Sequence, residues 1–228
     1  MNIKACVFDA YGTLFDVAAA AREAAAEPGN EALAEVWPKL AADWRLKQLQ
    51  YSWLRAVTGA HTGFWQVTQD GLDWAMEASG LEDAALRERL LALYFELSAY
   101  PEVPGMLATL KSEGFATAIL SNGSPDMLDG AVQSAGLAEF LDDVISVEDV
   151  GVFKPHASVY RLVPERMGVA VDEVLFVSSN GWDAACAKGF GFVTAWVNRA
   201  GEPVDRLPWT PDHILTDLSP IPDLTKGL

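Results

Sequence analysis

The stretch Ile3-Lys4-Ala5-Cys6-Val7-Phe8-Asp9-Ala10-Tyr11-Gly12-Thr13 decides the fold of this chain. Residues 3–8 are mostly apolar, which predicts a strand buried within a sheet. The strand ends at Asp9, and Gly12 allows a tight turn that brings backbone N–H groups around the Asp9 carboxylate. Asp9 is therefore a candidate for chemistry, although an aspartate at this place can also serve only as a turn residue.

Later segments repeat this kind of strand and alternate with helical patterns. The predicted strands are residues 116–120, 143–146, 174–177 and 192–197, and the predicted helices are residues 104–113, 125–135 and 156–167. Strands that alternate with helices favour right-handed parallel crossovers. The sequence therefore predicts an α/β fold whose core is a Rossmann-like, doubly wound parallel sheet.

Residues 16–99 have a different pattern. Helix-forming residues dominate there, and residues 31–54, 63–78 and 84–98 carry apolar side chains at close to helical spacing. The turn-rich stretch 100–105 marks the return to the sheet. We expect a core domain of residues 1–15 and 100–228, an inserted helical cap subdomain of residues 16–99, and a ligand cleft between them.

Composition and charge narrow the class of partner. The chain has 228 residues and a formal net charge of −16. A surface this acidic repels nucleic acid and anionic membranes, so we expect neither as a partner.

Cys6 and Cys186 lie in apolar surroundings outside any CxxC pair, which indicates buried thiols. The sequence shows no signal-peptide pattern and no apolar run of spanning length, and we expect a cytoplasmic protein.

Polar side chains follow the strands at four places. Asp9 ends the first strand, Ser121 and Asn122 follow the second, Lys154 precedes a helix, and residues 178–183 end the fourth. Each could have a local role, since serines cap helices and a lysine can lie on the surface. In a parallel sheet, however, these ends converge on one edge of the core. Their convergence predicts a single site for a small anion.

These residues resemble the four motifs of the haloacid dehalogenase superfamily, which are a nucleophilic Asp, a Ser or Thr, a Lys and an acidic loop. The resemblance covers nearly the whole chain. Within the superfamily, the sequence is most similar to the type II L-2-haloacid dehalogenases. The similar stretches are the first motif, Trp44-Arg45-Leu46-Lys47-Gln48-Leu49-Gln50-Tyr51 in the cap, Ser121-Asn122-Gly123, and Ser178-Ser179-Asn180-Gly181-Trp182-Asp183.

The residue types also distinguish a dehalogenase from a phosphatase. A metal-dependent phosphatase needs a second carboxylate two residues after the nucleophile, to protonate the leaving oxygen, and here that residue is Tyr11. It also needs acidic Mg²⁺ ligands in the fourth motif, where this chain has Ser179 and Asn180 and only Asp183 is acidic. Halide leaves without a proton, so carbon–halogen cleavage can dispense with both. We expect no metal and no cofactor.

The resemblance implies a two-step hydrolysis of a small (S)-2-haloacid. Asp9 would attack the halogen-bearing carbon, invert it and release halide, and water would then hydrolyse the aspartyl ester to give the (R)-2-hydroxy acid. Arg45 and Asn122 would bind the halide. Ser121, Lys154 and backbone N–H groups near Tyr11 would hold the substrate carboxylate, and Lys154 would lower the pKa of its carboxylate neighbours.

The remaining candidates would surround the nucleophile and the halogen. The residues expected to position or activate the water are Thr13, Ser178, Asn180, Tyr160 and Asp183, with Asp183 as the candidate base. Phe64 and Trp182 would be apolar walls near the halogen. Large aromatic residues at helical spacing are also ordinary core residues, and an arginine on an amphipathic helix is also an ordinary solvated charge.

Two other classes of function stay open at this point. One is a Mg²⁺-dependent phosphatase or phosphonate-cleaving member of the same superfamily, and the other is a non-catalytic module that binds small anions. The three histidines share no metal-ligand spacing. By analogy with the family, and because the cap helices are rich in tryptophan, we also expect a homodimer.

Overall fold

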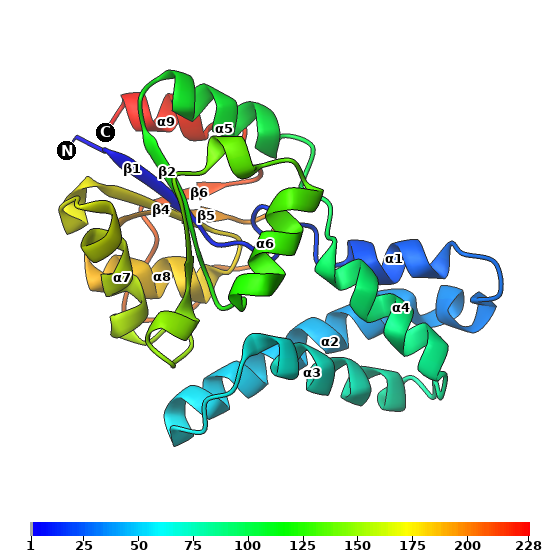
Figure 1. Cartoon of the computed structure of the whole chain (residues 1–228). Helices are drawn as coiled ribbons and strands as arrows, with labels where there is room; N and C mark the ends of the chain where they lie inside the picture. Colours follow the sequence, from blue (N-terminus) through cyan, green and yellow to red (C-terminus); the bar gives the residue numbers. More distant parts are fainter. Residues whose placement is uncertain (1) are drawn as a thin grey trace.

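The computed structural model describes residues 2–228 and contains a six-stranded sheet. Its strands are β1 (Ala5–Phe8), β2 (Ala116–Ser121), β3 (Asp143–Ser146), β4 (Val174–Ser178), β5 (Val193–Val197) and β6 (His213–Leu215). They lie in the order β3-β2-β1-β4-β5-β6, and every neighbouring pair is parallel (Figure 1). The predicted parallel sheet is confirmed.

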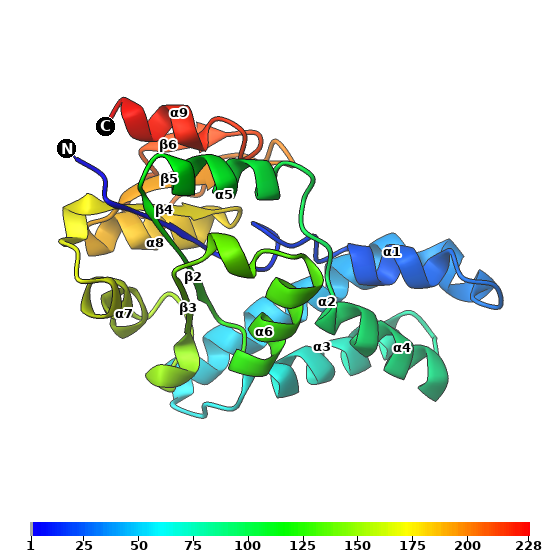
Figure 2. The ribbon, with the colours of Figure 1, turned by 45° about the horizontal axis from the view of Figure 1, so that its top comes forward.

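Helices cover both faces of this sheet. The helices α5 (Val103–Ser112) and α9 (Ile221–Lys226) lie over one face, and α7 (Ala157–Met167) and α8 (Gly181–Phe190) lie over the other (Figures 1 and 2). Helix α6 (Pro125–Ser134) joins β2 to β3. All residues of β1, β4 and β5 are buried. Parallel strands covered on both faces are apolar throughout, which explains the continuous runs in the sequence.

The order of the strands reverses at the centre of the sheet. From β1 the chain proceeds to β2 and β3 on one side, whereas β4, β5 and β6 lie on the other. The reversal falls between β1 and β4, and the carboxyl ends of these strands carry Asp9 and Ser178. Doubly wound sheets bind ligands at this kind of crevice. The topology thus brings the first and fourth predicted motifs together.

Residues 16–99 fold into four helices. These are α1 (Ala19–Ala25), α2 (Glu31–Thr58), α3 (Phe64–Ala78) and α4 (Ala84–Phe95), and they lie together beyond the carboxyl end of β1 (Figures 1 and 2). Helices α2 and α3 pack closely because Gly71 faces Trp44, where an added Cβ would lie 3.3 Å from the indole ring. The Trp44 indole N–H also donates to the Thr68 carbonyl at 2.8 Å. This packing gives the long helix α2 a firm support on α3.

Two adjacent segments connect these helices to the sheet. The Asp16 N–H donates to the Ser98 carbonyl at 3.0 Å, and the Tyr100 N–H donates to the Leu14 carbonyl at 2.9 Å. We propose that residues 16–99 form a cap and that residues 1–15 and 100–228 form the core, and the two names denote these ranges below. Met1 of the predicted core range lies outside the described residues.

The structure differs from the prediction mainly because it contains further helices and one further strand. Helices α1, α8 and α9 and the edge strand β6 have no counterpart in the prediction. Helix α2 continues to Thr58 and ends at Gly59, whose φ of 69° suits a glycine helix terminus. Helix α4 ends at Phe95, before the predicted residue 98. None of the helices within residues 2–228 has the length and apolar composition required to cross a membrane.

Candidate active site

The carboxylate of Asp9 lies at the carboxyl end of β1 and is only 6% exposed. One oxygen, Oδ2, accepts hydrogen bonds from Thr13 Oγ1 at 2.9 Å and from Asn180 Nδ2 at 3.2 Å. The other, Oδ1, accepts from Lys154 Nζ at 3.1 Å. Donors from three different loops therefore fix the orientation of this carboxylate.

The turn after β1 depends on Gly12. Its φ is +90°, and an added Cβ would lie 3.1 Å from the Ser179 hydroxyl. A side chain here would thus be strained and would also press on the Ser179 hydroxyl. That loop approaches closely enough for the Ser179 N–H to donate to Thr13 Oγ1 at 2.8 Å. The glycine therefore allows Thr13 to link the two loops while its hydroxyl donates to Asp9.

Lys154 is a buried cation between two carboxylates. Its Nζ lies 3.1 Å from Asp9 Oδ1 and 2.9 Å from Asp183 Oδ2, and its side chain is 1% exposed. The second oxygen of Asp183 accepts a hydrogen bond from the Tyr160 hydroxyl at 2.7 Å. A buried charge requires such partners, and here each charged group has at least two of them.

Burial and charge pairing affect the pKa values of this cluster in opposite directions. Burial alone would lower the pKa of Lys154, but the adjacent Asp183 and Asp9 carboxylates raise it above its usual 10.5. Burial raises the pKa of Asp183 above its usual 3.8, although Lys154 acts to lower it. Lys154 therefore acts on the pKa of Asp183 in the expected direction, but complete burial has the larger effect and the net shift is upward. A raised pKa suits a carboxylate that accepts a proton from water.

The loop after β2 lies next to this cluster. The Asn122 side-chain oxygen accepts a hydrogen bond from the Lys154 backbone N–H at 2.9 Å, which directs the amide nitrogen away from that contact. The Ser121 hydroxyl accepts from the Gly123 N–H at 3.0 Å. In the loop after β4, the Ser178 hydroxyl accepts from the Asn180 N–H at 3.1 Å. Ser178 thus supports the backbone of Asn180, whose side chain contacts Asp9.

Arg45 is the cationic side chain that the cap contributes. It extends from α2, and its Nη2 donates to the Tyr11 carbonyl at 3.0 Å and to Asn180 Oδ1 at 3.2 Å. Asn180 in turn donates to Asp9. A single amide therefore connects the cap arginine to the carboxylate of the core.

Tyr11, Phe64 and Trp182, three of the four predicted aromatic site residues, occupy different positions. Tyr11 is buried, and its ring lies 6.0 Å from that of Phe64 and 5.7 Å from that of Tyr94. Trp182 packs edge-on against Trp53 at 5.3 Å. It also borders a cavity of about 440 Å³ that Gly12 and Asn180 help to line. Phe64 and Tyr11 thus form one apolar wall, and Trp182 forms another beside the Asn180 loop.

The donors around Asp9 do not suit a divalent cation. Mg²⁺ requires several oxygen ligands, whereas Asp9 faces an ammonium, an amide N–H and a hydroxyl hydrogen. Lys154 Nζ occupies the space between the two carboxylates that could have shared a metal. No group of three or more His, Cys, Asp or Glu side chains suited to a metal is found within residues 2–228.

Comparison with known proteins identifies the family. The model of the haloacid dehalogenase-like hydrolases matches residues 3–191. The chain belongs to this family. It is 46% identical over 227 residues to (S)-2-haloacid dehalogenase 1 of a Pseudomonas species (strain CBS-3), with 99% of this chain and 98% of that protein covered.

Solved structures of dehalogenases are similar over nearly the whole chain. One is the L-2-haloacid dehalogenase from Xanthobacter autotrophicus with chloropropionic acid covalently bound, which is 40% identical with a TM-score of 0.86 and 99% of each chain covered. Another is a dehalogenase crystal structure that is 41% identical with a TM-score of 0.92, covering 97% of this chain and 96% of the other.

Three further residues, which were not predicted, contact predicted site residues. Ser179 donates to Thr13 through its N–H, and it belongs to a motif that the sequence already pointed to. Arg199 donates to the Thr13 carbonyl at 3.3 Å and pairs with Glu102 at 2.7 Å. Glu148 accepts a hydrogen bond from the cap. The last two have no sequence signal, because only the folded chain brings them to the site.

Proposed function

We propose that this protein is an (S)-2-haloacid dehalogenase, which converts a short (S)-2-haloalkanoate into the (R)-2-hydroxyalkanoate and halide. The observation that carries the proposal is the environment of Asp9. Two residues after it stands the buried aromatic Tyr11 rather than an acid, and a lysine ammonium lies against it. A carboxylate with these neighbours suits a leaving group that departs without a proton. The identity to curated (S)-2-haloacid dehalogenases supports the same reaction.

In the first step, an oxygen of Asp9 forms a bond to C2 of the substrate while the carbon–halogen bond breaks. The electron pair of that bond leaves with the halide, and C2 inverts. Thr13, Asn180 and Lys154 hold the carboxylate so that it is already oriented for attack. Such preorganisation removes much of the entropic cost of the encounter. The covalently bound chloropropionic acid in the Xanthobacter autotrophicus relative is consistent with this step.

The departing halide needs a positive or N–H-rich environment. Arg45 donates to neutral oxygens of Tyr11 and Asn180, so its positive charge stays available for an anion. Asn122 directs its oxygen to the Lys154 backbone, which leaves its amide N–H groups for a ligand. We assign these two residues to the halide.

The substrate carboxylate requires a second set of donors. We assign Ser121, Lys154 and the backbone N–H groups near Tyr11 to it. We assign Tyr11 and Phe64, whose rings lie 6.0 Å apart, to the apolar part of the substrate, together with Trp182, and exclusion of water by these rings would strengthen the electrostatic contacts within the site.

In the second step, water attacks the carbonyl carbon of the Asp9 ester. One proton of the water passes to a base, and the bond between the carbonyl carbon and the oxygen now attached to C2 breaks. That oxygen takes up the proton from the base and leaves as the hydroxyl of the 2-hydroxy acid, and Asp9 is regenerated as the carboxylate. Asp183 is the base we propose, with Tyr160 and Lys154 fixing its two oxygens. Thr13, Ser178 and Asn180 would position the water near the ester. We propose that neither step requires a metal or a cofactor.

The reaction is tested by halide release from each enantiomer of 2-chloropropionate with excess EDTA. We expect release from the (S)-acid, (R)-lactate as product, and no hydrolysis of phosphate esters with Mg²⁺. Phosphate release that depends on Mg²⁺, without halide release, would contradict the assignment in favour of a phosphatase.

We also propose that the protein is a homodimer formed through the cap. Leu46, Leu54 and Val57 on α2 and Trp74 on α3 are large apolar side chains that are more than a third exposed. Exposed apolar side chains grouped on two packed helices are typical of an interface. Sedimentation equilibrium should give twice the chain mass, and the charged variant Val57→Glu should shift the protein toward monomer.

A further inference from the structure

A carboxylate of the core contacts the start of a cap helix. Glu148 lies on a short 3₁₀ helix (Val147–Asp149) directly after β3. Its Oε1 accepts a hydrogen bond from the Phe64 N–H at 3.3 Å, and its Oε2 lies 2.9 Å from His61 Nε2. Both oxygens of one core side chain are therefore engaged by the loop that connects α2 to α3.

Helix α3 has no N-cap side chain of its own. Its N-cap residue is Gly63, which offers no oxygen to the free N–H groups of the first turn. Those groups require an acceptor, and a negative charge at a helix N-terminus is also favourable to the helix dipole. Glu148, which belongs to the core, supplies both the hydrogen-bond acceptor and the negative charge. An added Cβ at Gly63 would lie 3.7 Å from Glu148 Oε1, so the carboxylate lies directly against this turn.

The residue held by this contact is one of the proposed substrate walls. Phe64 is the first residue of α3 and is 1% exposed. Its ring lies 6.0 Å from Tyr11, which follows the nucleophile, and 6.0 Å from Phe153, which precedes Lys154. The His61 ring also packs on Phe153, at 4.7 Å. A displacement of the start of α3 would therefore move the ring that packs on both Tyr11 and Phe153.

Hydrogen bonds through Ser146 also connect Glu148 to the loop after β2. The Ser146 hydroxyl accepts a hydrogen bond from the Glu148 N–H at 3.2 Å and donates to the Gly123 carbonyl at 2.7 Å. Gly123 belongs to the loop that carries Ser121 and Asn122. One set of contacts thus joins the loop after β2, the 3₁₀ helix and the start of α3.

We propose that Glu148 is a positioning residue, which caps α3 from the core and thereby fixes Phe64 over the substrate. This inference rests on the proposed function only for the role of Phe64. The contact between Glu148 and α3 can be tested without any turnover. Glu148 contacts none of Asp9, Lys154 and Asp183 by hydrogen bond, so its loss should affect substrate binding more than the chemical step.

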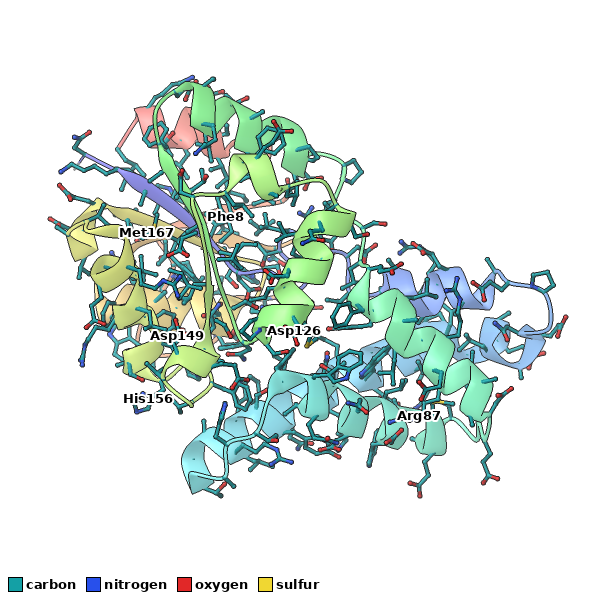
Figure 3. The ribbon with its side chains drawn as sticks, viewed as in Figure 1. Phe8, Arg87, Asp126, Asp149, His156 and Met167 are labelled. Carbon is teal, nitrogen blue, oxygen red and sulfur yellow. The ribbon has the colours of Figure 1, made fainter. Side chains whose placement is uncertain are left out.

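The test compares Glu148→Ala with two variants. Glu148→Gln keeps an oxygen that can accept from Phe64. Asp149→Ala removes the next residue of the same 3₁₀ helix, an exposed carboxylate that pairs with Arg166 at 2.6 Å and makes no hydrogen bond to the cap within residues 2–228 (Figure 3). This matched control reports the effect of removing an ion pair from the same element.

For Glu148→Ala we expect KM for (S)-2-chloropropionate to rise about fivefold, as for the loss of a helix cap, with kcat changed less than about twofold. Glu148→Gln should restore KM to within about twofold of wild type. Asp149→Ala should leave both constants unchanged. An unchanged KM in Glu148→Ala, or an equal rise in Asp149→Ala, would overturn the proposal.

Amide hydrogen exchange of residues 61–67 gives the second measurement. Exchange there should accelerate in Glu148→Ala and stay at the wild-type rate in Asp149→Ala, because only the first variant frees the turn. Equal exchange in the two variants would refute the capping contact whether or not the wild type releases halide. If the wild type released no halide while exchange behaved as expected, the proposed function would be contradicted, but the contact between Glu148 and the start of α3 would be supported.

Discussion

The carboxyl edge of the sheet and helix α2 both place charge beside Asp9, but they do so differently. Asp9, Lys154 and Asp183 are almost inaccessible, and each is held by two or more partners. Arg45 is half-buried and contacts only two neutral oxygens, with no carboxylate within ion-pair distance in the described part of the chain. The core neutralises its cation, whereas the cap leaves its cation free.

This difference assigns separate tasks to the two regions. Two carboxylates and one ammonium leave the core cluster with a net negative charge, which would repel an anionic substrate on a protein whose net charge is already −16. In the proposed reaction, the unpaired charge of Arg45 would offset that repulsion where the halide develops. The core should therefore control attack and stability, and the cap should control departure of the halide.

The largest effect is expected for Asp9→Asn, which removes the nucleophile without changing its shape. We expect kcat to fall by at least about 10⁴-fold, because a neutral amide cannot form the ester that the proposed reaction requires. Circular dichroism and thermal unfolding should show an intact fold. Turnover near the wild-type rate would exclude Asp9 as nucleophile.

Lys154→Met tests the structural role of the buried core charge. It leaves two buried carboxylates facing each other, so the free energy of unfolding in urea should fall by about 3–5 kcal/mol. Because the folded pKa of Lys154 is raised above 10.5, this stabilisation is complete below that pH and is lost as the pH rises through the folded pKa. The difference from wild type should thus be constant between pH 7 and 9 and shrink above the folded pKa.

Arg45→Ala is the matching test of the cap charge. We expect kcat to fall by about 10²–10³-fold, as for removal of a donor that stabilises a developing anion. Stability should change by less than about 1 kcal/mol. Arg87→Ala serves as control, because Arg87 pairs with Asp73 on the cap surface, far from Phe8, the residue before Asp9 (Figure 3). A loss of stability comparable to that of Lys154→Met would contradict the contrast between the two regions.

The smallest effect concerns the pH profile. If Asp183 is the base, activity requires its carboxylate, and the acidic limb of kcat should lie above pH 3.8 because burial raises the Asp183 pKa. The Tyr160 hydroxyl donates to the ionised form and lowers that pKa, so Tyr160→Phe should move the limb to higher pH, by up to about one unit. A shift to lower pH would contradict the assignment.

The sequence predicted the parts of the site that follow directly from strand ends. Asp9, Ser121 and Ser178 each end or follow a buried apolar run, and parallel pairing alone brings such ends to one edge. The raised pKa of Asp183 could not be predicted, because it depends on complete burial of a side chain on α8, a helix absent from the prediction.

The resemblance to the family placed Arg45 of the cap at the site, but the contact of Glu148 with the cap was beyond sequence reasoning. His61 and Glu148 are 87 residues apart in the chain, and nothing in either segment indicates the other. Their contact depends on how far α2 extends, and α2 runs past the predicted residue 54 to Thr58. Short elements such as β6 and α9 lack enough residues for a period to be recognised.

The most direct test of the account is a single turnover of (S)-2-chloropropionate in H₂¹⁸O with enzyme in excess. If Asp9 forms an ester that water opens at the carbonyl carbon, the first lactate carries unlabelled oxygen from the protein. Mass spectrometry of the peptide containing Asp9 should then show ¹⁸O, with more incorporated after repeated turnovers. Label that enters lactate directly in the first turnover, with Asp9 unlabelled, would contradict nucleophilic attack by Asp9.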